Sequence, residues 1–194
     1  MRYCVKIQKM ARTPSNMLPL GTTAPNFDLL NTVTNENVGL QSLKGKKGTV
    51  VMFICNHCPF VIHVNEELVR IANKYMNDGI GFIAISSNDV VNYPQDGPDL
   101  MRERAMELNY PFPYLYDETQ EVAKAYDAAC TPDLYIFDSN LSLVYRGQLD
   151  DSRPGNGIPV TGSDLRKALD NLINENPIDT DQKPSIGCNI KWKV

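Results

Sequence analysis

Two cysteines and a histidine stand together in the run Cys55-Asn56-His57-Cys58-Pro59. Two thiols at this spacing can reach each other across one helical turn, and a cysteine attacks as its thiolate. An imidazole between them titrates near neutral pH, and its protonated form would stabilise a neighbouring thiolate. The residue types and spacing therefore predict thiol–disulfide chemistry. The alternatives are a structural zinc half-site, two inert core thiols and a solvated histidine.

The segments on either side of the motif predict how it is positioned. The apolar run 49–54 indicates a buried strand, and apolar residues recurring from Val61 to Tyr75 predict an amphipathic helix over about 56–77. The motif thus lies where a strand ends and a helix begins, with Pro59 in the first helical turn. Unpaired N–H groups and the helix dipole favour negative charge there, so we expect a cysteine at this point to have a lowered pKa.

The rest of the chain alternates strands with helices. We expect a hairpin from 26–30 and 38–40, a strand at 80–86, a helix at 98–109 and a short edge strand within 112–116. A helix at 118–127 follows, with a capping box of Asp117 and Gln120. Strands at 133–138 and 141–146 are joined by the two residues 139–140, and the last helix spans about 163–175. This order predicts an α/β fold with a central mixed sheet between helices, preceded by a hairpin and carrying a helical insertion.

Length and composition indicate one globular domain. The chain has 194 residues, of which 42% are hydrophobic and 22% charged. We expect a lead-in over 1–17, the domain over 18–176 and a tail over 177–194 packed on it. The polar loops 88–98 and 150–162 are expected to border the site.

The net charge and the hydropathy of the chain limit the classes of partner that we expect it to bind. The net charge of −4 argues against nucleic acid and acidic membranes. Neither a membrane-spanning stretch nor a signal peptide is visible, so we expect a cytoplasmic protein. Nothing resembles a dinucleotide or phosphate loop, so no organic cofactor is expected. The oligomeric state stays open.

The motif and its surroundings resemble a known family. "FICNHCPFV" after a strand, Thr131-Pro132 far downstream and the opening "LGTTAPNFDL" are similar to the thioredoxin superfamily, and more narrowly to its peroxiredoxin-like (AhpC/TSA, redoxin) branch. The resemblance covers about 18–175. It implies a thioredoxin fold and a thiol-disulfide oxidoreductase whose partners are protein or small-molecule thiols and disulfides. The substrate and the direction of electron flow stay open.

The resemblance also implies residue roles. Cys55 would be the exposed nucleophile and Cys58 the resolving thiol. Pro132 would be cis, and Thr131 before it would pair with a substrate backbone, whereas the alternative is a trans proline entering a strand. Because the motif is similar to the Cys-Pro-His-Cys of strongly oxidising disulfide donors, with Asn56 in place of proline, we expect a potential above the value of about −270 mV typical of thioredoxin.

The three remaining cysteines have weaker signals. Five cysteines are an odd number and do not indicate a disulfide framework. Cys130 precedes Thr131 and is either an accessory resolving thiol or a small buried residue. Cys188 is either a C-terminal resolving thiol, as in two-cysteine peroxiredoxins, or part of a tail held to the domain by Trp192. Cys4 lies in the lead-in as an incidental thiol.

Two other functions compete with the oxidoreductase. Peroxiredoxins carry Pro-x-x-x-Thr-x-x-Cys; aligned on Cys58, this chain has Cys55 at the threonine and Val51 at the proline position, so a thiol peroxidase is the second hypothesis. A metal carrier is the third, because Cys55, His57, Cys58 and His63 are soft or borderline ligands. The cysteine spacing is shorter than in copper-delivery proteins of this fold, and we expect no metal.

Overall fold

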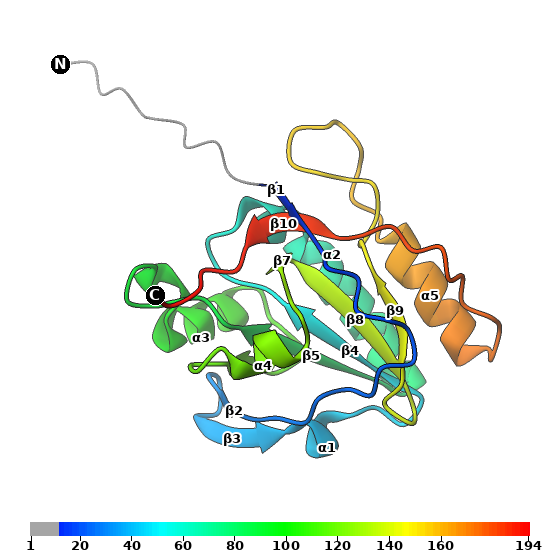
Figure 1. The fold of residues 1–194 in the computed structure, drawn as a ribbon, viewed down its shortest axis with the longest axis horizontal. Coiled ribbons are helices and arrows are strands. Elements are labelled where there is room, and N and C mark those ends of the chain that lie inside the picture. Colours follow the sequence, from blue (N-terminus) through cyan, green and yellow to red (C-terminus); the bar gives the residue numbers. More distant parts are fainter. Residues whose placement is uncertain (1–11) are drawn as a thin grey trace.

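A seven-stranded mixed sheet forms the centre of the molecule, in the strand order β3-β2-β6-β5-β4-β8-β9 (Figure 1). The computed structural model describes residues 12–194. The strands are β1 Arg12–Pro14, β2 Asp28–Asn31, β3 Glu36–Gly39, β4 Gly48–Phe53, β5 Ile80–Ser86, β6 Tyr114–Tyr116, β7 Cys130–Thr131, β8 Asp133–Asp138, β9 Leu143–Gly147 and β10 Ile186–Asn189. The helices are α1 Leu40–Leu43, α2 Pro59–Tyr75, α3 Pro98–Glu107, α4 Glu121–Ala125 and α5 Ser163–Ile173.

Strand β4 lies in the middle of this sheet and leads into the motif. It pairs in parallel with β5 and antiparallel with β8, and all six of its residues are buried. Its side chains alternate between the two faces: Val50 and Met52 join one core, whereas Val51 and Phe53 join the other. A strand buried on both faces needs a continuous apolar run, which 49–54 supplies.

Helices cover both faces of the sheet, as the order of elements predicted. The first core contains apolar side chains of α2, α3 and α5, and the second contains Leu40 of α1 and Ala123 of α4. Figure 1 shows α2 running behind β4 and β8, with α5 beside β9. The mixed sheet between helices is the thioredoxin-like α/β fold that was expected.

A second, three-stranded sheet joins both ends of the described chain to its body. Its order is β1-β10-β7, and all its pairs are antiparallel. In Figure 1, β10 (red) lies between the blue β1 and the short β7. Trp192, which was one candidate for holding the tail to the domain, is 40% exposed, so backbone pairing of β10 holds this segment instead.

Two expected strand details are wrong. Strand β6 is internal rather than an edge strand, because the β2–β3 hairpin extends the sheet beyond it and β2 pairs with it. Its prolines at 111 and 113 precede the paired residues and remove no ladder bond. The turn after β8 spans 139–142 rather than 139–140, because Leu141 has a positive φ of 61° and Phe137 pairs with Leu143.

The helix boundaries also differ from the sequence prediction. Helix α2 begins at Pro59 rather than about 56, so the motif precedes it. Helix α4 begins after Gln120, whose φ of 65° prevents a capping box. The carboxylate of Asp117 still caps it, accepting the N–H of Ala123 at 2.9 Å, while the Gln120 amide donates to the Ser87 and Lys191 carbonyls.

Within residues 12–194, the structure has no helix that is both long enough and apolar enough to cross a membrane.

Candidate redox site

The two cysteines of the motif lie in the turn between β4 and α2. Strand β4 ends at Phe53, Cys58 is the N-cap residue of α2, and Pro59 opens the helix. Both thiols are buried: Cys55 is 2% and Cys58 0% exposed. The expectation that Cys55 is exposed is therefore wrong for this structure, because Thr131 lies against the sulfurs of Cys55 and Cys58, and Cys188 of β10 lies against the sulfur of Cys58.

Thr131 touches both motif sulfurs. Its Oγ1 is 3.4 Å from Cys55 Sγ, and its carbonyl oxygen accepts a bond from the Cys58 thiol at 3.1 Å. The Thr131–Pro132 peptide bond is cis, which confirms that expectation. Residue 131 therefore lies against the reactive atoms with both its side chain and its backbone.

A third sulfur completes the cluster. Cys188 Sγ in β10 is 2.7 Å from Cys58 Sγ, at the buried end of the motif. Cys188 itself is 5% exposed. The structure therefore brings together three of the five cysteines, one of them 130 residues along the chain from its neighbour.

The cluster distributes charge unequally among its sulfurs. Hydrogen bonds with the thiols of Cys188 and Cys55, with smaller contributions from Thr131 and the Val61 N–H, lower the pKa of Cys58 to about 2. The same bond raises the pKa of Cys55, as do burial and the negative charge of Asp96. The bond to Cys58 likewise raises the pKa of Cys188. The lowered pKa expected at the helix start therefore belongs to Cys58 rather than Cys55.

Asp96, at the end of loop 88–98, was missed by the sequence interpretation. Its carboxylate is fully buried and accepts the Asn56 N–H at 2.8 Å, the His57 N–H at 3.3 Å and the Asn88 amide at 2.8 Å. It also accepts the Nδ1–H of His57 at 2.6 Å. The only sequence signal was its position in a loop after a parallel strand, which does not distinguish it from other acidic residues there.

His57 is held rather than freely solvated. Asp96 fixes its Nδ1, and its ring stacks on Tyr93 with centroids 5.5 Å apart. Its side chain stays 23% exposed. A surface hollow of about 360 Å³, lined partly by Asn56, His57 and Gln95, lies next to it. The imidazole thus connects a buried carboxylate with the surface beside the thiols.

The expected substrate groove at Thr131 and Pro132 is filled by the chain itself. Strand β10 pairs antiparallel with β7, placing Cys188 opposite Thr131 and Asn189 opposite Cys130. A Cβ on Gly187 would lie 2.0 Å from the Thr131 carbonyl oxygen, so only glycine allows this approach. The backbone of residue 131 is therefore already paired, and a substrate would have to displace β10 to use it.

The other candidate residues lie apart from this chemistry. Cys130 is buried, and burial raises the pKa of its thiol, which donates to the Pro132 carbonyl. That environment fits the small buried residue. His63 shares a hydrogen bond with Ser152 Oγ at 2.8 Å, away from the motif. Cys4 lies outside the described residues.

One group of potential metal ligands occurs in the described part of the chain. Cys55 Sγ, a ring nitrogen of His57 and a carboxylate oxygen of Asp96 lie within 4.8 Å of one another. However, Asp96 already accepts four N–H donors, one of them the His57 Nδ1–H. A metal would have to displace these bonds, so the arrangement favours a hydrogen-bonded network.

Comparisons with known proteins place this geometry in context. The model of the AhpC/TSA family matches residues 20–146. A comparison with curated proteins gave no match. An uncharacterized conserved protein from Geobacillus kaustophilus is 62% identical, with a TM-score of 0.94, covering 96% of this chain and 98% of its own.

Two further solved structures are similar over most of their length. A hypothetical protein from Sinorhizobium meliloti is 44% identical with a TM-score of 0.91, covering 94% of this chain and 99% of its own. The thioredoxin domain of a thiol-disulfide oxidoreductase from Bacteroides vulgatus is 19% identical with a TM-score of 0.56, covering 66% of this chain and 88% of its own. This last likeness supports the thioredoxin fold.

Proposed function

Since the chain belongs to the AhpC/TSA family, we propose that it is a thiol-disulfide oxidoreductase that cycles between a Cys55–Cys58 dithiol and disulfide. One observation carries the proposal: the two cysteines of the motif lie together in the turn before α2, with Thr131 3.4 Å from Cys55 Sγ and 3.1 Å from Cys58 Sγ. Hydrogen bonding to Cys188 and Cys55 lowers the pKa of Cys58 to about 2, so that one thiol of the pair ionises much more readily than the other. A cysteine pair that holds one proton and one negative charge is ready for thiol–disulfide exchange. Its substrates are protein or small-molecule thiols and disulfides.

In the reducing direction, Cys55 attacks and Cys58 resolves. The Cys55 proton moves along the hydrogen bond to Cys58, leaving a Cys55 thiolate. This thiolate attacks a substrate disulfide, so that a Cys55–substrate bond forms and one substrate sulfur leaves as a thiolate. Cys58 then attacks Cys55 Sγ; the Cys55–Cys58 bond forms, and the second substrate sulfur leaves and takes up the proton that Cys58 loses. Both substrate sulfurs are reduced by the two electrons that the dithiol loses.

His57 supports these steps by exchanging protons, and Asp96 supports them by orienting His57 and the turn that carries the thiols. With Nδ1 donating to Asp96, the other ring nitrogen of His57 is free to exchange a proton at the surface. The Asp96 carboxylate also holds the Asn56 and His57 N–H groups, which fixes the turn that carries both thiols. Asp96 is a positioning residue in this proposal, whereas His57 serves the leaving thiolates.

The charge distribution supports an oxidising dithiol. Anything that stabilises the thiolate favours the reduced form over the disulfide and so raises the reduction potential. Hydrogen bonds lower the pKa of Cys58 to about 2. We therefore retain the prediction of a potential above about −270 mV.

A second candidate is peroxide reduction by the same thiols, which the family match favours. The threonine of the peroxiredoxin motif is replaced by Cys55, but Thr131 supplies a hydroxyl 3.4 Å from its sulfur. In this reaction a thiolate would attack one peroxide oxygen and become a sulfenic acid, as the O–O bond breaks and the other oxygen leaves as water or an alcohol. A second thiol would then condense with the sulfenic acid to form a disulfide and release water.

Activity measurements with a disulfide and with a peroxide distinguish the oxidoreductase from the peroxidase. We expect the wild type to reduce the disulfides of insulin with dithiothreitol as electron source, and Cys55→Ser and Cys58→Ser each to lose activity by at least about tenfold, since each removes one of two exchange partners. Cys130→Ser is the matched control and should keep wild-type activity. Consumption of hydrogen peroxide without insulin reduction would instead support the peroxidase.

A further inference from the structure

Cys188 contacts the reactive pair although it lies far away in the sequence. Its sulfur is 2.7 Å from Cys58 Sγ. That is only about 0.7 Å longer than a disulfide bond of about 2.05 Å. Cys58 therefore has two sulfur neighbours, Cys55 in its own turn and Cys188 in β10. Both are potential disulfide partners of Cys58.

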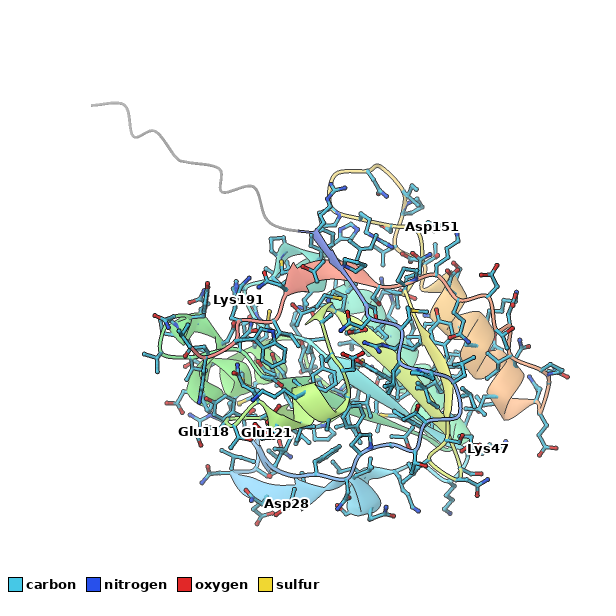
Figure 2. The ribbon with its side chains drawn as sticks, in the orientation of Figure 1. Asp28, Lys47, Glu118, Glu121, Asp151 and Lys191 are labelled. Atoms are coloured by element: carbon cyan, nitrogen blue, oxygen red, sulfur yellow. The ribbon has the colours of Figure 1, made fainter. Side chains whose placement is uncertain are left out.

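Several contacts fix Cys188 in this position. Its strand pairs with β1 on one side and with Thr131 of β7 on the other. After the strand, the Lys191 N–H donates to the Asn88 side chain at 2.8 Å, and its carbonyl accepts the Asp89 N–H at 2.8 Å. Figure 2 labels Lys191 at the point where the chain leaves β10. The sulfur contact is thus built into the fold.

We propose that Cys188 is a third redox-active thiol, which exchanges with Cys55 for the disulfide to Cys58. This inference rests on the proposed Cys55–Cys58 cycle, which supplies the starting disulfide. The Cys188 thiolate attacks Cys58 Sγ; the Cys58–Cys188 bond forms as the Cys55–Cys58 bond breaks, and the electron pair leaves on Cys55 Sγ. The proton lost by Cys188 is taken up by Cys55, so no outside oxidant or reductant is needed.

The exchange has two consequences. It returns Cys55 to the thiol state while the protein stays oxidised, so that Cys55 can engage a further sulfur. It also ties β10 covalently to the start of α2, above the backbone of Thr131. The Cys58–Cys188 state therefore has its groove closed by its own strand, whereas the Cys55–Cys58 state leaves β10 held by noncovalent contacts alone.

Disulfide mapping tests the proposal directly. Reduced wild type, Cys55→Ser, Cys188→Ser and the control Cys130→Ser are equilibrated with oxidised glutathione, alkylated and digested with trypsin without reduction. Cys55 and Cys58 lie in the tryptic peptide 48–70 and Cys188 in 168–191, since Pro184 blocks cleavage after Lys183. A Cys55–Cys58 bond stays within one peptide, whereas a Cys58–Cys188 bond links two.

We expect the wild type and Cys130→Ser to give both products, Cys188→Ser the internal bond alone, and Cys55→Ser the linked peptides as its main oxidised product. Thermal unfolding confirms that each variant is folded, and Cys55→Ala replaces any serine variant that is not. If the wild type forms the internal bond while Cys55→Ser stays alkylated or stops at a glutathione adduct, the inference fails and the proposed function stands. If no Cys55–Cys58 bond forms in any variant, both fail.

Discussion

Three sulfurs and a buried carboxylate decide the chemistry at the scale of single residues. Hydrogen bonding between Cys58 and the thiols of Cys55 and Cys188 lowers the pKa of Cys58 and raises the pKa values of the other two, so a negative charge in this buried cluster is favoured on Cys58. Asp96 adds a second buried negative charge, which opposes a charge on Cys55. The charge is therefore confined to Cys58 until a proton moves, which makes proton transfer within the cluster part of every exchange step.

The shared charge predicts how stability depends on pH. The pKa of Cys58 is lowered to about 2 from an unfolded value of about 8.5. Between these two pH values the unfolded chain binds more protons than the folded chain, so the free energy of unfolding rises with pH. Above the unfolded value, Cys55 and Cys188 keep protons that the unfolded chain loses, so stability falls.

The Tm of the reduced wild type, relative to that of Cys58→Ser, should therefore increase between about pH 5 and 8. Part of this increase should be lost by about pH 10. Thermal unfolding of both proteins under dithiothreitol measures the difference. A difference that is flat across this range would mean that Cys58 carries no charge in the folded state.

Asp96→Asn should disturb both stability and thiol chemistry. An amide cannot accept all the N–H groups that Asp96 binds, so we expect a loss of about 2–3 kcal/mol in unfolding free energy. Removal of the negative charge also lowers the pKa of Cys55, which should react faster with iodoacetamide.

Urea unfolding and peptide-resolved alkylation measure the two effects. Asp99→Asn, on the exposed face of α3, is the matched control and should change stability by less than about 0.5 kcal/mol. If Cys55 reacts equally fast in Asp96→Asn and in the wild type, the charge of Asp96 does not raise the pKa of Cys55.

Part of this site is readable from the sequence and part is not. Cys55, His57 and Cys58 are adjacent along the chain, so a local pattern of strand, motif and helix identified them together. Asp96 and Cys188 reach the motif only through tertiary structure, across 39 residues from His57 and 130 from Cys58. No local pattern distinguishes them, so the sequence could not show which of the two motif cysteines has the lowered pKa; their contacts lower the pKa of Cys58 and raise that of Cys55.

At the scale of elements, β10 controls access to the site. Its contact with Thr131 requires glycine at 187, because a Cβ there would lie 2.0 Å from a carbonyl oxygen. The strand therefore has one register that both closes the groove and places Cys188 at Cys58. Substrates that pair with residue 131 would have to compete with this strand.

Gly187→Ala should loosen this cover. We expect a loss of about 1–3 kcal/mol in unfolding free energy, as for other overpacked sites. Alkylation of Cys58 should become faster, because β10 moves away from Thr131. Asn189→Ala, an exposed position in the same strand, is the control and should behave like the wild type. Protection of Cys58 that is equal in Gly187→Ala and wild type would show that β10 does not cover the site.

The elements were largely predictable because their patterns are strong. Strands β4 and β5 are continuous apolar runs, and α2 repeats its apolar residues at helical spacing, so each was found within a few residues. The edge position of β6 was wrong because pairing partners are set by the distant β2–β3 hairpin. Strand β10 was missed because its four residues are too few for a period.

At the scale of the whole molecule, a buried ion pair between two neighbouring strands of the central sheet also binds the residue that follows β1 of the second sheet. Asp133 of β8 accepts Ser15 Oγ at 2.7 Å and lies 3.3 Å from a guanidinium nitrogen of Arg146 in β9. Both side chains are fully buried. Burial raises the pKa of Asp133, while Arg146 and Ser15 oppose the shift. This pair fixes β1 and, through it, β10 above the central sheet.

Asp133→Asn should therefore be among the most damaging substitutions outside the thiol cluster. It leaves the Arg146 charge buried without its carboxylate, which costs about 3–5 kcal/mol. Denaturant unfolding measures the loss. Asp127→Asn is the control, since Asp127 is half exposed and 3.8 Å from Arg146, and should lose less than about 1 kcal/mol. Equal losses in the two variants would contradict the role given to the buried pair.

The central claim is that Cys55 and Cys58 form a reversible redox pair. The most direct test is a redox titration of the wild type in glutathione buffers, with alkylation and peptide mapping at each point. We predict a two-electron transition in which Cys55 and Cys58 lose their alkylation together, at a potential above about −270 mV. Full alkylation of both cysteines at every potential up to about −120 mV would contradict the account.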